Sequence, residues 1–180
     1  MSRTQHIILM AEYNAWMNVK LYEAAMRLSD EEINANRNAF FGSVLGTLNH
    51  LAVGDILWLK RFATHPANYS ALEFVRNFPM PVGLDQVLYP DIQSLATHRK
   101  RLDQVIQEWA CAMKEEDLDF VLAYTNMKGL DAQKNYFSLV MHFFNHQTHH
   151  RGQATTLLSQ ANVEIGITDL VAIIPNESAI

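Results

Sequence analysis

Hydrophobic residues recur at helical spacing in four separate stretches of the chain. The first covers about residues 4–28, and the second runs from residue 42 to about residue 62. The third begins at Leu84 or Pro90 and ends at Ala112, and the fourth covers about residues 135–159. Apolar residues at this spacing form one stripe on a helix, so each stretch predicts a helix with a buried face.

The segments between these stretches predict how the helices are connected. Residues 67–83 contain Pro79, Pro81 and Gly83, which indicate a long crossover between the second and third helices, with one helical turn around residues 72–76. Residues 120–130 are typical of a short hairpin. Residues 29–38 are interpreted as a connection between helices. The C-terminal tail is expected to pack across the bundle. Four long helices with one long crossover predict an all-α four-helix bundle, formed by a single domain over residues 1–180.

Composition and charge narrow the class of protein. The 180 residues are enough for a substantial core, and 49% of them are hydrophobic. The net charge of −5 provides no basic surface for nucleic acid or anionic lipid, and we find no apolar run of about 20 residues that would span a membrane. The single cysteine, Cys111, excludes an intramolecular disulfide and is interpreted as a small packing residue. These features, and the lack of a signal-peptide pattern, predict a soluble, cytoplasmic protein.

Histidines are concentrated in the fourth predicted helix. His142, His146, His149 and His150 fall within nine residues, and His146 and His150 lie one turn apart on a face that also carries apolar residues. Two imidazoles at this spacing can bind one zinc, nickel, copper or iron ion. A third ligand must come from another helix, and His50, among apolar residues of the second helix, is the candidate. Three neutral imidazoles leave at least one coordination position for water, as in catalytic rather than structural sites.

The same segment carries a family resemblance. Residues 145–153, which read Asn-His-Gln-Thr-His-His-Arg-Gly-Gln, resemble the signature of the DinB family of bacterial damage-inducible proteins. Three further regions agree with that family: residues 13–18; His50 with Asp55, Trp58 and Arg61; and the tail with Gly166, Asp169, Leu170 and Pro175.

The resemblance implies an up-down-down-up four-helix bundle, frequently a homodimer, with nickel or zinc bound by His50, His146 and His150. The family is also similar to bacterial transferases and isomerases that use low-molecular-weight thiols such as bacillithiol or mycothiol.

Four further residues are candidates for binding a substrate or cofactor. Asn14 and Asn18 share one stripe of the first helix, where they either hydrogen-bond within the core or orient a metal-bound water or substrate. His142 is expected to line the pocket or to replace a ligand, and Gln153 to hold a substrate. His149 is expected to face outward or toward a second copy of the chain.

Three functional hypotheses remain open at this point. The first is a metal-dependent enzyme of the thiol-transferase or hydrolase type, acting on a small molecule. The second is a non-catalytic, stress-induced protein that binds metal or a small ligand. In the third, the histidines merely fill a polar core. A homodimer is expected through apolar side chains outside the bundle core, for which the candidates are Tyr22, Met26, Phe40 and Phe41.

Overall fold

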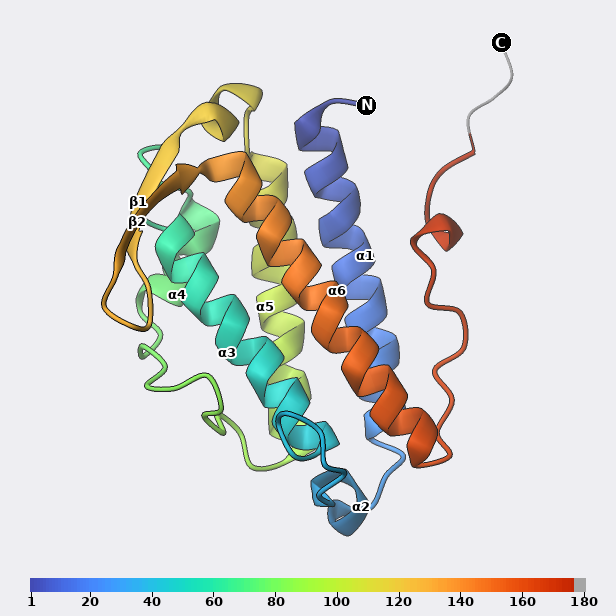
Figure 1. Ribbon diagram of the computed structural model, residues 1–180. Coiled ribbons are helices and arrows are strands. Elements are labelled where there is room, and N and C mark those ends of the chain that lie inside the picture. Colours follow the sequence, from blue (N-terminus) through green and yellow to red (C-terminus); the bar gives the residue numbers. More distant parts are fainter. Residues whose placement is uncertain (177–180) are drawn as a thin grey trace.

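The computed structural model describes residues 1–176 and is mostly helical. Four long helices lie side by side: α1 (Arg3–Ala25), α3 (Val44–Phe62), α5 (Ile92–Ala112) and α6 (Tyr136–Gln160) (Figure 1). α1 packs against α5 and α6, and α3 packs against the same two helices. α1 and α6 run in one direction along the bundle, and α3 and α5 run in the other (Figure 1). The prediction of a mainly helical fold is confirmed.

The connections and the C-terminal tail contain short helical elements, of which only the turn around residues 72–76 was predicted. They are α2 (Asp30–Asn34), η1 (Ser70–Leu72), α4 (Glu73–Arg76), η2 (Glu115–Asp119) and η3 (Leu170–Ala172). α2 forms inside the segment interpreted as a plain connection because Ser29 and Glu32 make a capping box. Each side chain of such a box accepts a backbone N–H that would otherwise lack a partner at the helix start.

Side-chain caps fix where the long helices begin. The Asp91 carboxylate accepts the Ser94 N–H at 2.8 Å, so α5 begins at Ile92 rather than at Leu84 or Pro90, and the crossover continues to residue 91. Ser43 caps α3, where its hydroxyl accepts the Gly46 N–H at 3.0 Å. An uncapped start would leave backbone donors without partners, so these residues set the helix boundaries.

The predicted hairpin consists of β1 (Val121–Thr125) and β2 (Asp131–Asn135), which pair antiparallel with Val121 opposite Asn135. The turn between them places Gly129 at a φ of +76°, a conformation that glycine adopts without strain. Trp58 of α3 lies edge-on against Tyr124 of β1, with ring centroids 5.5 Å apart. The hairpin therefore packs beside the C-terminal half of α3 (Figure 1).

The core between the helices is rich in aromatic side chains. Phe62 and Trp109 stack with ring centroids 5.1 Å apart, and the Trp109 indole N–H donates to the Tyr136 hydroxyl at 3.1 Å. Cys111, two residues beyond Trp109, is exposed, so its interpretation as a packing residue is wrong. Over residues 1–176, we find no helix that is both long and apolar enough to cross a membrane.

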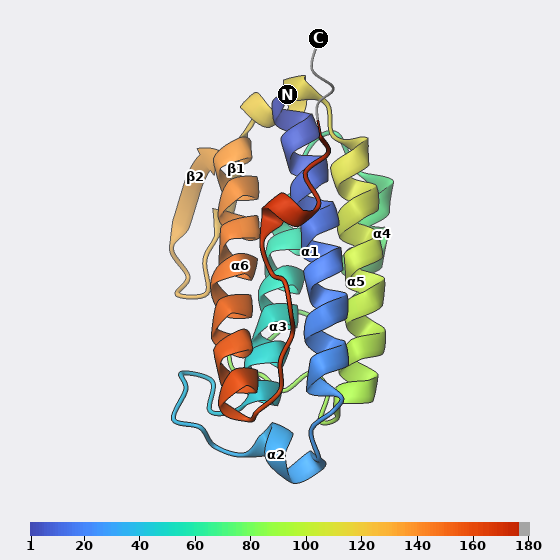
Figure 2. The ribbon, with the colours of Figure 1, turned by 90° about the vertical axis from the view of Figure 1, so that its right-hand side faces the viewer.

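The C-terminal tail runs along α1 after α6 ends (Figure 2). The Tyr13 hydroxyl donates to the Thr168 carbonyl at 2.6 Å, and the Lys20 ammonium donates to the Ile167 carbonyl. These bonds satisfy backbone oxygens of an irregular segment and hold residues 167 and 168 against α1. The apolar stretch that was expected to pack across the bundle has no buried residue between Leu170 and Ala172, so that part of the prediction is wrong.

Candidate metal centre

The close approach of α3 and α6 depends on a glycine. A Cβ atom placed on Gly54 would lie 2.7 Å from Cε1 of His146, which is shorter than real Cβ contacts. Glycine in the interior of a helix is costly, and here its lack of a side chain provides the space for the His146 imidazole. His50 lies one turn before Gly54 on α3, so its side chain reaches the same region of α6.

Three imidazoles meet at this contact. Potential ligand atoms of His50, His146 and His150 all lie within 4.8 Å of one another. The ring centroid of His150 is 4.4 Å from that of His50 and 4.4 Å from that of His146. The three predicted ligands therefore come together from two helices, in an arrangement that could hold one metal ion.

The second nitrogen of two of these rings already has a partner. Nδ1 of His50 lies 2.7 Å from the Leu84 carbonyl, and Nδ1 of His150 lies 2.7 Å from the Gln153 side-chain oxygen. Both partners accept hydrogen bonds, so both Nδ1 atoms carry the proton and both Nε2 atoms carry a lone pair. These Nε2 atoms face each other at 3.1 Å, a separation that two lone pairs tolerate only with a cation or proton between them.

The environment keeps the imidazoles neutral. Burial, followed by the charges of His150 and His50, lowers the pKa of His146 from its ordinary value to about 3. Burial also lowers the pKa of His50 and that of His150. The Phe41 ring stacks on the His50 ring, with centroids 3.8 Å apart, and covers one face of the imidazole. Neutral imidazole is the form that binds metal, so the site fits a cation.

The other two histidines of α6 are exposed. The His142 ring packs edge-on against Trp58, with centroids 4.9 Å apart, and lies 6.1 Å from the His146 ring. A ring nitrogen of His149 lies 3.2 Å from the Gln153 side-chain nitrogen, which donates to it. Of the four candidate binding residues, His142 and Gln153 therefore lie next to the three imidazoles.

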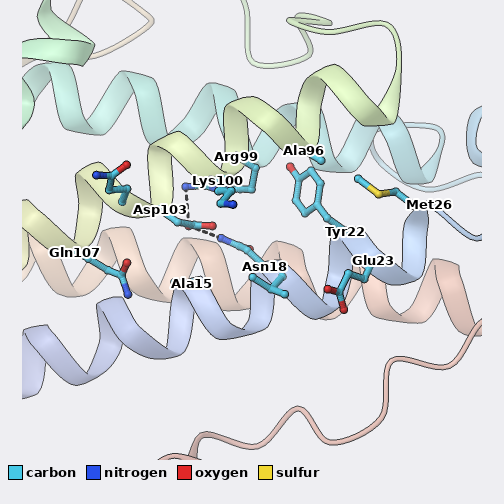
Figure 3. A pocket seen from close by; sticks show the side chains of 12 residues that line it. Ala15, Asn18, Tyr22, Glu23, Met26, Ala96, Arg99, Lys100, Asp103 and Gln107 are labelled. Carbon is cyan, nitrogen blue, oxygen red and sulfur yellow. Dashed lines mark hydrogen bonds and ion pairs between the residues drawn. The ribbon is translucent and has the colours of Figure 1, made fainter.

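Asn14 and Asn18 lie in a different group of polar side chains. Both are buried, and both donate to the same Asp103 oxygen, at 3.1 Å from Asn14 and 2.8 Å from Asn18. The Arg151 guanidinium donates to the Asn14 oxygen. Figure 3 shows the Asn18 amide turned toward Asp103, between α1 and α5. This placement matches the alternative in which the two amides hydrogen-bond within the core.

The buried polar group continues to α3. The Arg99 guanidinium pairs with the Asp55 carboxylate and lies 2.9 Å from Asp103. The Gln147 side chain donates to Asp55 as well. Burial, opposed by the charge of Arg99, raises the pKa of Asp55 to about 6. Asp55 therefore ties α3 to α5 and α6 and does not orient a histidine.

Three residues that build the site were not identified from the sequence. Gly54 has a signal, because a glycine four residues after a candidate ligand in an apolar helix indicates a close approach. Phe41 was assigned to a possible dimer surface, and its stacking on His50 depends on the path of the loop before α3. Leu84 acts through its backbone carbonyl, for which the sequence carries no signal.

Comparison with known proteins agrees with the resemblance in the histidine segment. A family model described as the DinB family matches residues 1–177. The chain is 24% identical to Protein DinB of Bacillus subtilis (strain 168) over 158 residues, which cover 88% of this chain and 87% of that protein. No solved structure matches the chain. The family match includes both helices that carry the three imidazoles.

Proposed function

The chain belongs to the DinB family, and we propose that it binds one divalent transition-metal ion, nickel or zinc, through His50, His146 and His150. The observation that carries this proposal is the pair of Nε2 atoms of His50 and His150, which face each other at 3.1 Å while both Nδ1 atoms are hydrogen-bonded elsewhere. A cation satisfies both lone pairs, and His146 supplies the third nitrogen.

We further propose a metal-dependent enzyme of the thiol-transferase or hydrolase type that acts on a small molecule, with a low-molecular-weight thiol as the cofactor of the transferase. A bound ion of this kind acts as a Lewis acid and lowers the pKa of a water or thiol toward neutrality. The chain's own residues orient the site: Leu84 and Gln153 keep the protons on Nδ1 of His50 and His150. Partial desolvation of the His142 ring, which packs against Trp58, and the charge of Arg61 lower the pKa of His142, so a neutral ring nitrogen is available beside the site to accept a proton.

The alternative is a non-catalytic, stress-induced protein that binds metal or a small ligand. It is supported by Phe41, whose ring covers one face of His50, a residue with only 4% of its surface exposed. A ligand that is shielded from water in this way can hold an ion tightly, whether or not a reaction takes place at that ion.

We infer one DinB-like domain with the up-down-down-up helix order, and a homodimer. Of the apolar side chains proposed for the dimer contact, Phe40 and Met26 are 88% and 43% exposed, Phe41 is partly exposed, and Tyr22 is buried. Light scattering at micromolar concentration should give twice the chain mass of 20.6 kDa, and a mass near 20.6 kDa would contradict the dimer.

Elemental analysis of the purified protein tests the metal site. We expect close to one nickel or zinc ion per chain, and a strong loss of metal in His150→Ala, because two imidazoles bind far more weakly than three. His142→Ala is the matched control, since it removes an exposed imidazole from the same helix, and it should retain the metal. Full occupancy in His150→Ala would show that the ligand set is wrong, and loss of metal in His142→Ala would then make His142 the third ligand.

Turnover separates the enzyme from the binding protein. Protein of known metal content is incubated with a low-molecular-weight thiol and electrophilic acceptors, and in a second series with hydrolysable esters and amides. Metal-dependent turnover supports the enzyme, whereas tight metal retention without turnover supports the alternative.

A further inference from the structure

A cavity of about 360 Å³ lies between the C-terminal half of α3, the crossover and the hairpin. We call it the hairpin pocket. α3 contributes Leu57, Lys60, Arg61 and Thr64 to its lining, the crossover contributes Met80, and the hairpin contributes Ala123, Tyr124, Thr125, Asn126 and Met127. Its volume is in the range of sites that bind small molecules.

The charge of the hairpin pocket is opposite to that of the whole chain. Lys60 and Arg61 line the pocket, and its lining contains no acidic residue among those that the structure describes. Neither cation takes part in an ion pair within residues 1–176. In a chain with a net charge of −5, two neighbouring cations without a carboxylate form a local positive site.

Other contacts hold both cations in place. The Arg61 guanidinium lies over the rings of Trp58 and Tyr124, at 4.6 Å and 4.9 Å from their centroids. The Lys60 ammonium donates to the Arg76 carbonyl at 3.0 Å. Burial lowers the pKa of both side chains, so each positive charge is partly desolvated without a negative partner. Cations fixed in this way lose little further entropy when an anion binds.

The remaining lining provides a donor and an apolar surface. The Asn126 side-chain oxygen accepts the backbone N–H groups of Lys128 and Leu130, at 2.8 Å and 3.1 Å, which leaves its NH₂ group to donate elsewhere. The side chains of Leu57, Met80 and Met127 are apolar. An inorganic anion would leave this apolar surface uncovered, whereas an organic anion covers it.

We propose that the hairpin pocket binds a small carboxylate that carries a short apolar chain. Lys60 and Arg61 contact the carboxylate, Asn126 donates a hydrogen bond, and the apolar chain lies on Leu57 and the two methionines. The site goes beyond the proposed metal centre and does not depend on it, although Trp58 lies between Arg61 and His142.

Three probes of similar size or charge test the chemistry of the ligand. Hexanoate, its neutral analogue hexanamide and inorganic phosphate are titrated into ¹⁵N-labelled protein, and the backbone amides of Ala123, Thr125 and Asn126 are followed by NMR. Hexanoate should shift these amides saturably. Hexanamide and phosphate should bind at least about tenfold more weakly, since each lacks either the charge or the apolar chain. Equal binding of hexanamide would overturn the proposal.

Variants locate the site. Arg61→Gln and Lys60→Gln should each weaken hexanoate binding about tenfold. Arg101→Gln is the matched control, because Arg101 also lies over an aromatic ring, that of Phe74, but on α5. His150→Ala should bind hexanoate normally, which separates this site from the metal centre.

Thermal unfolding establishes that each variant is folded, and if Arg61→Gln is not, Lys60→Gln carries the test. Unchanged affinity in a folded Lys60 or Arg61 variant, or a loss in His150→Ala, would place the anion elsewhere.

Discussion

Gly54→Ala should weaken metal binding without destabilising the metal-free protein. The added methyl group would lie 2.7 Å from Cε1 of His146, whereas ordinary contacts begin at 3.4 Å, so the imidazole must move by about 0.7 Å. Metal sites tolerate deviations of only about 0.2 Å in ligand distances. His146 is partly exposed, so its ring can turn toward solvent and away from the other two imidazoles.

Gly54→Ala should lower the metal affinity but should not lower the stability of the metal-free protein. Disturbing the support of one ligand typically lowers metal affinity by about 10- to 100-fold. Alanine in place of glycine stabilises a helix interior by about 0.5–1 kcal/mol, which offsets the cost of moving His146. A variant that merely damaged packing would lose stability and affinity together, and this difference identifies the role of Gly54.

Isothermal titration with zinc measures the affinity, and urea unfolding of the metal-free protein measures the stability. Gly152→Ala is the matched control, since Gly152 lies on α6 and a methyl group added there would meet only open space. It should gain stability and keep its zinc affinity. Unchanged affinity in Gly54→Ala, or an equal loss in Gly152→Ala, would refute the reasoning.

Three further predictions concern other parts of the chain. Cys111→Ser should leave any metal-dependent turnover intact while chelation abolishes it, because Cys111 lies on α5 whereas the three imidazoles lie on α3 and α6. Loss of turnover with metal retained would make the cysteine the nucleophile. Burial, followed by the charge of Arg99, lowers the pKa of His98 from 6.5 to about 4, so the unfolded chain binds a proton between these values and the folded protein does not. Stability should therefore fall by up to about 3 kcal/mol from pH 6.5 to pH 4, and urea unfolding at both pH values should show a smaller fall in His98→Phe. Asp55→Ala removes a buried partner of Arg99 and should lower the free energy of unfolding by about 3 kcal/mol, whereas Arg3→Gln, at exposed ion pairs with Glu115 and Asp119, should lower it far less in the same assay.

The long helices and the histidine pair were predictable because their signals are local. A repeat of apolar residues predicts a helix wherever it occurs, and two histidines four residues apart share a face in any helix. The short helix α2 was also predictable, since Ser29 and Glu32 have the spacing of a capping box. The prediction failed there because the segment lacks an apolar stripe.

The partners of polar residues were not predictable, because they depend on how helices distant in sequence are rotated toward one another. Asn14 and Asn18 suit a ligand site and a core equally well until Asp103 is found beside them, 85 and more residues away in sequence. The same holds for Cys111, whose exposure depends on the rotation of α5. The Leu84 carbonyl reaches His50 only through the path of the crossover.

The buried polar group and the metal centre are linked through the register of α6. Gln147 and Arg151 each follow a candidate ligand by one residue, so they point about 100° away from His146 and His150. Gln147 donates to Asp55 of α3, and Arg151 donates to Asn14 of α1. A rotation or slip of α6 that separated the imidazoles would also break these buried hydrogen bonds and leave polar groups without partners, which is costly away from water. The polar core therefore fixes the rotation of α6 that brings its two imidazoles to His50, even though its members do not contact the ion site themselves.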